Sequence, residues 1–375
     1  MPFLLPEPWR LLLSPLAGLY GGLVEIRNLY FDRGYLPAHK LPVPVISVGN
    51  LSVGGSGKTP VTAFLARKLE SQGLRVAVLT QGYGRRSREL ISLTRDRLRD
   101  IPPEKTGDEP RILASRLERG TVWIHRNRIF AARQALNSRE YRPDVFLLDD
   151  GFQHRFLRRD LEVLTVDART LQEPQQLLPV GWLREPLRQG RRADLVWFTR
   201  VNQSQTRPED IARWFSRAGF LRPFLLSGHR PAGVVSVADG SLRPAEWLRG
   251  RKVIAFCGIA APESFRRTLV ELGAEPEDFH AFRDHKILSQ REWRELLRRA
   301  EGRGAEWVVT TEKDAVRQEI PKMIRPKLLF LRVEIEIYRG QEILERMLEA
   351  KGIFSTEPEA NGKQLPARGP VKNPK

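Results

Sequence analysis

Short apolar runs alternate with helical patterns along the first two thirds of the chain. Strands that are apolar along their whole length are typical of a parallel sheet with helices on both faces. Loops at the carboxyl ends of such strands gather at one edge of the sheet, where ligands bind. The runs that predict strands in this part of the chain are 43–48, 75–80, 121–124, 144–148, 162–166 and 195–199.

A second, smaller α/β unit is predicted beyond Pro223. Apolar runs at 252–256, 307–310 and 327–333 predict strands, and helical patterns lie between them. Four prolines and few apolar residues from Gly352 onward are typical of a disordered tail. We therefore expect an N-terminal amphipathic helix region, a main α/β domain, a smaller α/β domain and a tail, at residues 1–35, 36–225, 226–350 and 351–375.

The N-terminal stretch 11–24 is uncharged, with apolar and aromatic residues at helical spacing. It is shorter than the roughly 20 apolar residues that a membrane span needs, and no small-residue cleavage site of a secretory signal follows it. A helix buried in the core is one interpretation. A helix lying in the lipid headgroup layer is favoured, with Arg10 and Arg27 near its ends. The residues expected to face the membrane are Trp9, Leu12, Leu16 and Tyr20.

A glycine-rich loop follows the first strand, and Lys58-Thr59 and a helical pattern follow the loop. Glycines let backbone N–H groups turn onto phosphate oxygens, and a helix N-terminus adds partial positive charge. In this setting the lysine reaches the β- and γ-phosphates and the threonine hydroxyl ligates Mg²⁺. The usual G-x-x-x-x-G-K-[ST] pattern is incomplete, because Ser52 stands in the place of its first glycine. The residues expected to hold phosphates are Gly54, Gly55, Ser56, Gly57, Lys58 and Thr59.

Two adjacent acids, Asp149 and Asp150, follow the apolar run 145–148. An apolar strand that ends in an acid is typical of a Walker B strand, which places a carboxylate beside the Mg²⁺ of a nucleotide. Neighbouring residues on one strand point to opposite faces, so one of the two acids is expected to approach the metal directly. An acidic loop without a metal is the alternative.

Three further polar groups have two interpretations each. Asp108 either caps the helix that follows it, which the residues alone favour, or accepts the proton of a hydroxyl substrate. His285, after Asp284, is either structural or part of an acid–base pair. The cluster 310–314 is either a polar group at a strand end or the start of a helix.

The net charge limits the classes of binding partner, and the cysteine content limits the kinds of cross-link and metal site. The net charge of +18 indicates a polyanionic neighbour, either nucleic acid or an anionic membrane, or else a generally basic composition. No long basic tail or aromatic-interleaved module is present, so nucleic acid is not expected. A single cysteine, Cys257, excludes an internal disulfide and a cysteine metal cluster.

Together these motifs resemble the tetraacyldisaccharide 4′-kinase family, the membrane-associated P-loop kinases of lipid A synthesis. The resemblance runs in the family's order from the N-terminal helix to about Val333. Two positions depart from the family pattern: Ser56 replaces a threonine, and Lys286 replaces a second histidine. The motifs that carry the resemblance are 49–60, 82–85, 107–109, 149–154, 183–186, 284–285 and 311–314.

The resemblance implies transfer of the γ-phosphate of ATP to the 4′-hydroxyl of tetraacyldisaccharide 1-phosphate, giving lipid IVA, with ATP and Mg²⁺ as cofactors. It implies a P-loop NTPase-like fold in which residues 36–225 form the kinase domain and 226–350 close the cleft. It makes Asp108 the base, assisted by His285, and places Asp149 and Asp150 at the metal. Further candidate contacts to substrate or nucleotide are Arg85, Glu109, Gln153, His154 and Arg184.

The resemblance also implies peripheral attachment to the cytoplasmic face of the bacterial inner membrane, where the N-terminal helix docks and helps to take up acyl chains. The expected partners are then the lipid substrate and the membrane surface, without nucleic acid or an obligate protein partner. A P-loop ATPase or GTPase switch is the alternative, in which Gln153 orients a water molecule for hydrolysis.

Overall fold

The computed structural model describes residues 6–219, 221–259, 261–284 and 286–354. Within these ranges the strands form one mixed sheet in the order β11-β10-β12-β13-β8-β7-β6-β1-β5-β2-β4-β3, with β9 paired to β8. In chain order the strands are β1 Val45–Gly49, β2 Val76–Thr80, β3 Ile91–Leu93, β4 Thr121–Ile124, β5 Val145–Asp149, β6 Leu161–Asp167, β7 Leu195–Thr199, β8 Phe224–Ser236, β9 Leu242–Arg243, β10 Lys252–Cys257, β11 Glu275–Ala281, β12 Trp307–Thr311 and β13 Leu328–Arg339.

The sheet is mostly parallel, as the apolar runs predict. β1 pairs in parallel with β5 on one side and β6 on the other, and every residue of β1, β2, β5 and β7 is buried. Among the described strands the antiparallel pairs are β3–β4, β8–β13 and β8–β9. Burial on both faces explains why the strand sequences are continuously apolar.

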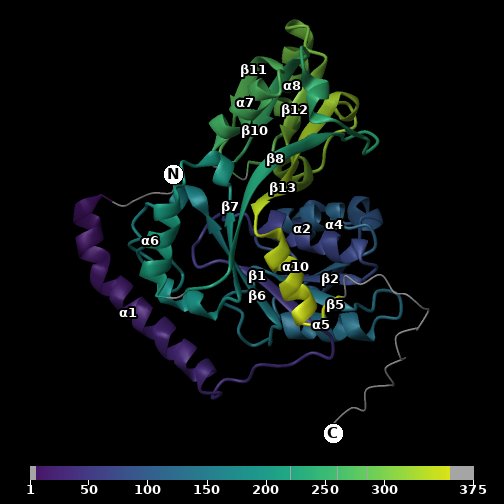
Figure 1. Cartoon of the computed structure of the whole chain (residues 1–375). Coiled ribbons are helices and arrows are strands. Elements are labelled where there is room, and N and C mark those ends of the chain that lie inside the picture. Colours follow the sequence, from purple (N-terminus) through teal and green to yellow (C-terminus); the bar gives the residue numbers. More distant parts are fainter. Residues whose placement is uncertain (1–5, 220, 260, 285, 355–375) are drawn as a thin grey trace.

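Helices cover the sheet in two lobes that the long strands β8 and β13 connect (Figure 1). The lower lobe surrounds β1 and the upper lobe contains β10, β11 and β12 (Figure 1). The predicted boundary between residues 225 and 226 falls inside β8. The helices are α1 Glu7–Asp32, α2 Lys58–Ser71, α3 Pro103–Thr106, α4 Asp108–Arg116, α5 Arg128–Asn137, α6 Pro208–Ala218, α7 Pro262–Glu271, α8 Gln290–Gly302, α9 Glu312–Arg317 and α10 Gln341–Ala350.

The helix α10 returns the chain to the lower lobe. Leu344 and Leu348 are fully buried in the same core cluster as Leu65 and Leu69 of α2. The Nζ atom of Lys68 lies 2.7 Å from a carboxylate oxygen of Glu345. Residues 341–350, predicted within the smaller domain, therefore pack against the main domain. Of the predicted tail, residues 355–375 lie outside the described residues.

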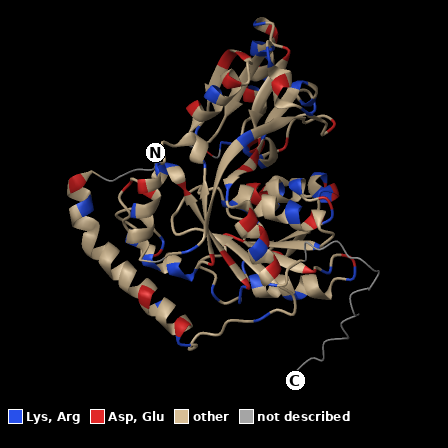
Figure 2. Ribbon diagram, in the orientation of Figure 1, with Lys and Arg blue, Asp and Glu red and all other residues tan. Residues whose placement is uncertain are grey.

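The helix α1 lies along the outside of the lower lobe and carries few charges along its middle (Figures 1 and 2). Trp9, Leu12 and Leu16 are 57%, 66% and 53% exposed, and within this helix only Gly21, Asn28 and Phe31 are buried. A helix with this pattern is not a core helix. Among the described residues, no helix has the length and apolar character to cross a membrane.

The middle of α1 packs against the lower lobe at Tyr20 and Gly21. A Cβ atom at Gly21 would lie 2.6 Å from Cδ1 of Leu177, so a larger residue there would displace the Leu177 side chain. The hydroxyl of Tyr20 donates a hydrogen bond of 2.8 Å to the backbone oxygen of Arg184. Tyr20 therefore differs from the expected membrane anchor, since its polar end faces the protein.

Candidate active site

The phosphate loop lies between the end of β1 and the start of α2, as predicted. Gly57 precedes the helix with a left-handed backbone, φ 81°, and a Cβ atom there would lie 3.0 Å from Oγ1 of Thr199. Both conditions require glycine. Because α2 begins at Lys58, the first N–H groups of the helix have no acceptor within it and are available to an anion.

The position of Ser52 explains why the loop functions without the first glycine of the usual pattern. Ser52 forms an antiparallel bridge with Leu183, and its Oγ accepts a hydrogen bond of 3.1 Å from Nδ2 of Asn50. Among the described non-glycine residues a positive φ occurs only at Asp150 and Arg200. Ser52 therefore has an ordinary backbone conformation that does not need glycine.

The side chain of Lys58 folds back over the loop. Its Nζ atom donates to Oδ1 of Asn50 at 3.1 Å and to the backbone oxygen of Gly54 at 3.4 Å, and it lies 3.5 Å from Oδ1 of Asp150. The ammonium group is thus held among acceptors at the mouth of the loop, where a phosphate oxygen could replace one of them.

Asp149, the last residue of β5, is 1% exposed. Its carboxylate accepts hydrogen bonds from the hydroxyls of Thr62, at 3.1 Å, and Thr80, at 3.4 Å. Burial, together with the negative charges of Glu109 and Asp150, raises the pKa of Asp149 to about 7. This carboxylate is therefore short of positive charge.

Asp150 turns the other way and lines the cleft between the lobes, with a left-handed backbone at φ 50°. Its carboxylate lies 2.9 Å from Nη1 of Arg184 and 3.5 Å from Nζ of Lys58. Burial opposes its ionisation, but Lys58 and Arg184 outweigh burial and lower the pKa of Asp150. The two acids thus have different surroundings, because Asp149 ends β5 and the left-handed backbone of Asp150 turns the chain away from the strand.

The charge of the acid cluster fits a divalent cation. Burial also raises the pKa of Glu109, whose charge and those of Asp149 and Asp150 repel one another. In the described part of the chain, no three His, Cys, Asp or Glu side chains are arranged to hold an ion by themselves. This arrangement suits Mg²⁺, which takes one or two protein oxygens and completes its coordination with phosphate oxygens and water. Thr59 also lines the cleft.

Asp108 is not a helix cap. Gly107 precedes α4, and no side chain caps this helix end, so the interpretation that the residues alone favour is wrong. Gly107 has φ 84°, and a Cβ atom there would lie 2.9 Å from the backbone oxygen of Tyr83. Oδ2 of Asp108 instead accepts a hydrogen bond of 2.8 Å from Nε of Arg317, the last residue of α9, which follows β12 of the upper lobe.

The cleft between the lobes has a volume of about 2090 Å³ and holds candidate residues from both sides. The phosphate loop, Asp150 and Glu109 line its lower side, and Asp284 and Lys313 line its upper side. His285 lies outside the described residues. The cluster 310–314 is both a strand end and a helix start, because Thr311 ends β12 and its hydroxyl caps α9.

Of the remaining residues predicted to contact substrate or nucleotide, one lines the cleft and the others lie behind its lining. Arg184 lines the cleft, whereas Arg85, Gln153 and His154 do not. Arg85 donates to the backbone oxygens of Glu89 and Ile124, which holds the loop after β2. Burial, with the nearby charge of arginines, lowers the pKa of His154 to about 3, so this imidazole is neutral.

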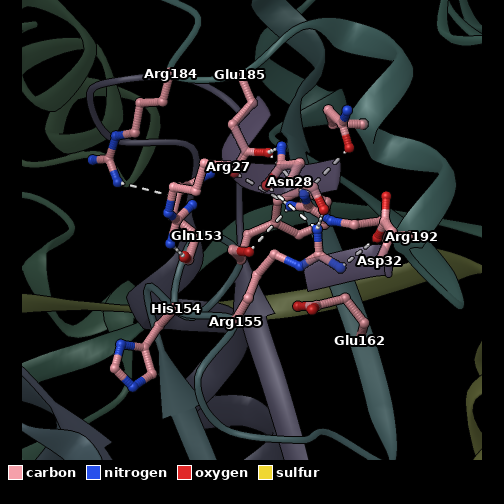
Figure 3. A network of polar contacts seen from close by, with 12 residues as sticks. Arg27, Asn28, Asp32, Gln153, His154, Arg155, Glu162, Arg184, Glu185 and Arg192 are labelled. Carbon is pink, nitrogen blue, oxygen red and sulfur yellow. Dashed lines mark hydrogen bonds and ion pairs between the residues drawn. The ribbon is translucent and has the colours of Figure 1, made fainter. Parts of the chain in front are cut away.

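Gln153 belongs to a polar network that joins α1 to the site (Figure 3). Nη2 of Arg27 donates to the backbone oxygen of Gln153 at 2.8 Å, and the amide of buried Asn28 donates to Oε2 of Glu185 at 2.8 Å. Glu185 also pairs with Arg192 at 2.9 Å. The helix α1 is therefore bound to the segments that carry Asp150 and Arg184.

The supporting contacts of the site were not predicted from the sequence, although Asn50 lies within the motif 49–60. Asn50 holds Lys58, and Nη2 of Arg128 donates to the backbone oxygen of Asp149 at 3.1 Å. Arg200 binds the phosphate loop through the backbone oxygen of Gly55 and pairs with Asp167 at 2.7 Å.

A glycine loop that ends in Lys-Thr at a helix start, between parallel strands, defines a P-loop protein. In the register of β1 with β5, Val48 lies opposite Asp149, so the acids stand beside the loop. A second lobe contributes polar residues to the same cleft, as expected where a nucleotide and an acceptor bind together.

The sequence model of the tetraacyldisaccharide-1-P 4′-kinase family matches residues 9–352. The tetraacyldisaccharide 4′-kinase of Anaeromyxobacter sp. (strain K) is 38% identical over 366 residues, covering 93% of this chain and 96% of that protein. That of Anaeromyxobacter sp. (strain Fw109-5) is 40% identical over 345 residues, covering 90% and 91%. The crystal structure of "apo" form LpxK from Aquifex aeolicus in complex with ATP is similar with a TM-score of 0.75 and 32% identity, covering 92% of this chain and 99% of that one. The chain belongs to the tetraacyldisaccharide 4′-kinase family.

Proposed function

We propose that the cleft transfers the γ-phosphate of ATP to the 4′-hydroxyl of tetraacyldisaccharide 1-phosphate and forms lipid IVA. The observation that carries this proposal is the placement of Lys58 beside Asp150 on the lower side of the cleft while Arg317, from the upper lobe, binds Asp108. Glu109 links the two pairs, because its carboxylate interacts electrostatically with both Lys58 and Asp108.

The phosphate loop would bind the donor. Gly54, Gly55, Ser56 and Gly57 present backbone around the phosphates, and Lys58 stabilises charge on the β- and γ-phosphate oxygens. Thr59 and the acids Asp149 and Asp150 would hold Mg²⁺, which neutralises phosphate charge when it is bound.

The acceptor reaction needs a base. The 4′-hydroxyl oxygen forms a bond to the γ-phosphorus, the bond from this phosphorus to the bridging oxygen breaks, and ADP leaves with that electron pair. Asp108 accepts the hydroxyl proton, and His285 assists in this transfer. Arg184 keeps Asp150 ionised beside Lys58 and lies close to where the phosphates enter.

The exposed face of α1 would rest on the cytoplasmic surface of the inner membrane as a peripheral attachment. Trp9, Leu12 and Leu16 supply the apolar contact, and the net charge of +18 favours anionic phospholipid and a phosphorylated lipid substrate. Neither nucleic acid nor an obligate protein partner is needed for this reaction.

Hydrolysis of the nucleotide is less well supported. Nε2 of Gln153 donates to the backbone oxygen of Asn50 at 2.9 Å, and its Oε1 lies 3.4 Å from Nη1 of Arg184. The side chain that would orient a water molecule is thus used to support the phosphate loop.

Transfer of radiolabelled phosphate from ATP to tetraacyldisaccharide 1-phosphate in detergent micelles tests the function. Labelled lipid product is expected from the folded protein. ATP consumption without labelled lipid would identify a hydrolase.

The role of the base is tested by Asp108→Ala. We expect kcat to fall by about 100-fold or more, as for loss of a general base, with little change in ATP affinity. Asp100→Ala, at an exposed acid just before α3, is the matched control and should keep normal turnover. Turnover of Asp108→Ala within about threefold of the unaltered enzyme would exclude Asp108 as the base.

A further inference from the structure

The motif 311–314 contains two acids, Glu312 and Asp314, that the proposed chemistry does not use. Thr311, Glu312 and Lys313 line the cleft, but Asp314 is 2% exposed and does not. A fully buried carboxylate is costly unless its surroundings supply donors. The contacts of Asp314 therefore indicate what it holds in place.

Asp314 belongs to a rigid frame in the upper lobe. Its Oδ2 accepts hydrogen bonds from the hydroxyl of Thr311, at 2.6 Å, and from the backbone N–H of Gly258, at 3.0 Å. Its Oδ1 accepts from Nη1 of Arg317 at 3.0 Å, and the same Nη1 donates to the backbone oxygen of Gly258 at 3.1 Å. One end of the Arg317 guanidinium is thus fixed by β10, β12 and α9.

The other edge of the same guanidinium reaches the lower lobe. Nε of Arg317 donates to Oδ2 of Asp108 at 2.8 Å, and its side chain is only 4% exposed. Nη2 of Arg317 lies 3.9 Å from Oδ1 of Asp284, the residue before His285. Arg317 therefore stands between the two segments that carry the proposed base and its assistant.

We infer that Arg317 is a positioning residue that holds the carboxylate of Asp108 in the orientation needed to accept the hydroxyl proton. The inference rests on the proposed function, because it requires Asp108 to be the base. Since the frame of Thr311, Asp314 and Gly258 sets the position of Arg317, the base is held in place only when the two lobes are together. The motif 311–314 then acts through Arg317 and needs no contact with substrate.

The planar fork of arginine is suited to this role. Nε and Nη1 point to different neighbours, so one side chain connects Asp108 with Asp314. A lysine carries its charge at a single nitrogen and cannot hold both carboxylates in the same geometry. Arg317→Lys is therefore expected to keep the fold better than Arg317→Gln and yet to lose most of the activity.

A double-mutant cycle separates positioning from an independent role. Arg317→Gln should lower kcat by about 100-fold, since a misplacement of about 1 Å has this effect, with ATP affinity within about threefold of normal. In the Asp108→Ala protein the same change should alter the remaining rate by less than about threefold, because Arg317 acts through Asp108. Arg325→Gln, at an exposed arginine that bonds the backbone oxygen of Ile320, is the matched control and should keep normal turnover.

Three results would overturn the inference. Turnover of Arg317→Gln near normal would show that Asp108 needs no such support. A further large loss on adding Arg317→Gln to Asp108→Ala would show that Arg317 acts by itself. Normal turnover of Asp108→Ala would refute both the role of Asp108 as the base and the positioning role of Arg317. An inactive Asp108→Ala protein together with an active Arg317→Gln protein would refute the positioning role alone. If circular dichroism shows that Arg317→Gln is unfolded, Arg317→Lys is tested by the same criteria, with a loss of about tenfold or more expected.

Discussion

Replacing Asp149 with asparagine should stabilise the unliganded protein while removing its activity. The pKa of this buried carboxyl group is raised from 3.8 to about 7. Between these two values the folded protein keeps a proton that the unfolded chain has lost, so its stability falls as the pH rises from about 4 to about 7. At about 1.4 kcal/mol for each pH unit, ionised Asp149 destabilises the folded state by about 4 kcal/mol at pH 8.

Asparagine would recover part of this free energy. Its amide oxygen can still accept from Thr62 or Thr80, but it is a weaker acceptor than a carboxylate. We expect a net gain of about 2 kcal/mol at pH 8, which raises Tm by about 2–3 °C in a chain of this size, and almost no gain at pH 5. Phosphate transfer should fall by about 100-fold or more, because charge at the proposed metal site is lost.

The assay is thermal unfolding at pH 5 and pH 8, with Asp150→Asn as the matched control. The pKa of Asp150 is lowered against the effect of burial by Lys58 and Arg184, so its charge stabilises the folded state above its ordinary pKa. Asp150→Asn should therefore lower stability at pH 8, by about 1–3 kcal/mol, since it removes the carboxylate that lies 3.5 Å from the buried Lys58 ammonium group. The two neighbouring variants should shift Tm in opposite directions.

Two outcomes would refute this reasoning. An Asp149→Asn protein that is less stable than the unaltered protein at pH 8 would mean that its hydrogen bonds outweigh the charge repulsion. A change in Tm that is equal at pH 5 and pH 8 would mean that ionisation of Asp149 is not the cause. Mg²⁺ with ATP should stabilise the unaltered protein more than Asp149→Asn, since only the former carries the extra negative charge.

Two further predictions concern α1. Changing Trp9, Leu12 and Leu16 together to serine should weaken binding to anionic phospholipid vesicles, measured by cosedimentation, by about 100-fold. Each exposed apolar side chain is expected to contribute about 1 kcal/mol or more to this binding. Unchanged binding, with normal activity in detergent, would show that α1 does not contact the membrane. Asn28→Ala should lower the free energy of unfolding by about 1–3 kcal/mol and speed protease cleavage within α1, because it leaves the buried Glu185 carboxylate with one donor fewer; an unchanged cleavage rate would show that this bond does not hold the helix.

The order of motifs along the chain was enough to predict the phosphate loop and the parallel sheet. The runs 121–124 and 195–199 coincide with β4 and β7, because these strands are buried along their whole length. The strand β8 gave no comparable pattern, since His229, Arg230 and Pro231 lie within it and the register with β13 shifts beside Pro231. Its length and its link between the lobes depend on pairing with β13, which is a non-local property.

The roles of single side chains depended still more on distant contacts. Asp108 and Glu109 are the first two residues of α4, and no local signal predicts that Asp108 also pairs with Arg317, 209 residues away. Leu344 and Leu348 have helical spacing, but no local signal tells which lobe they pack against. Sequence patterns report burial and helix ends, whereas partner choice is decided by the fold as a whole.

The acid cluster and the contacts between the lobes each set a condition for the proposed activity. Asp149 and Glu109 have raised pKa values because too little positive charge surrounds them, so the unliganded site is destabilised by its own acids. A cation that binds with the nucleotide phosphates removes this repulsion. The repulsion lowers the stability of the unliganded protein, and its removal adds to the affinity for the cation. On the upper side of the site, the buried pair of Arg317 and Asp108 holds only while the lobes are together. The proposed reaction therefore depends on a cation bound with the donor phosphates and on the contact between the lobes that places the proposed base.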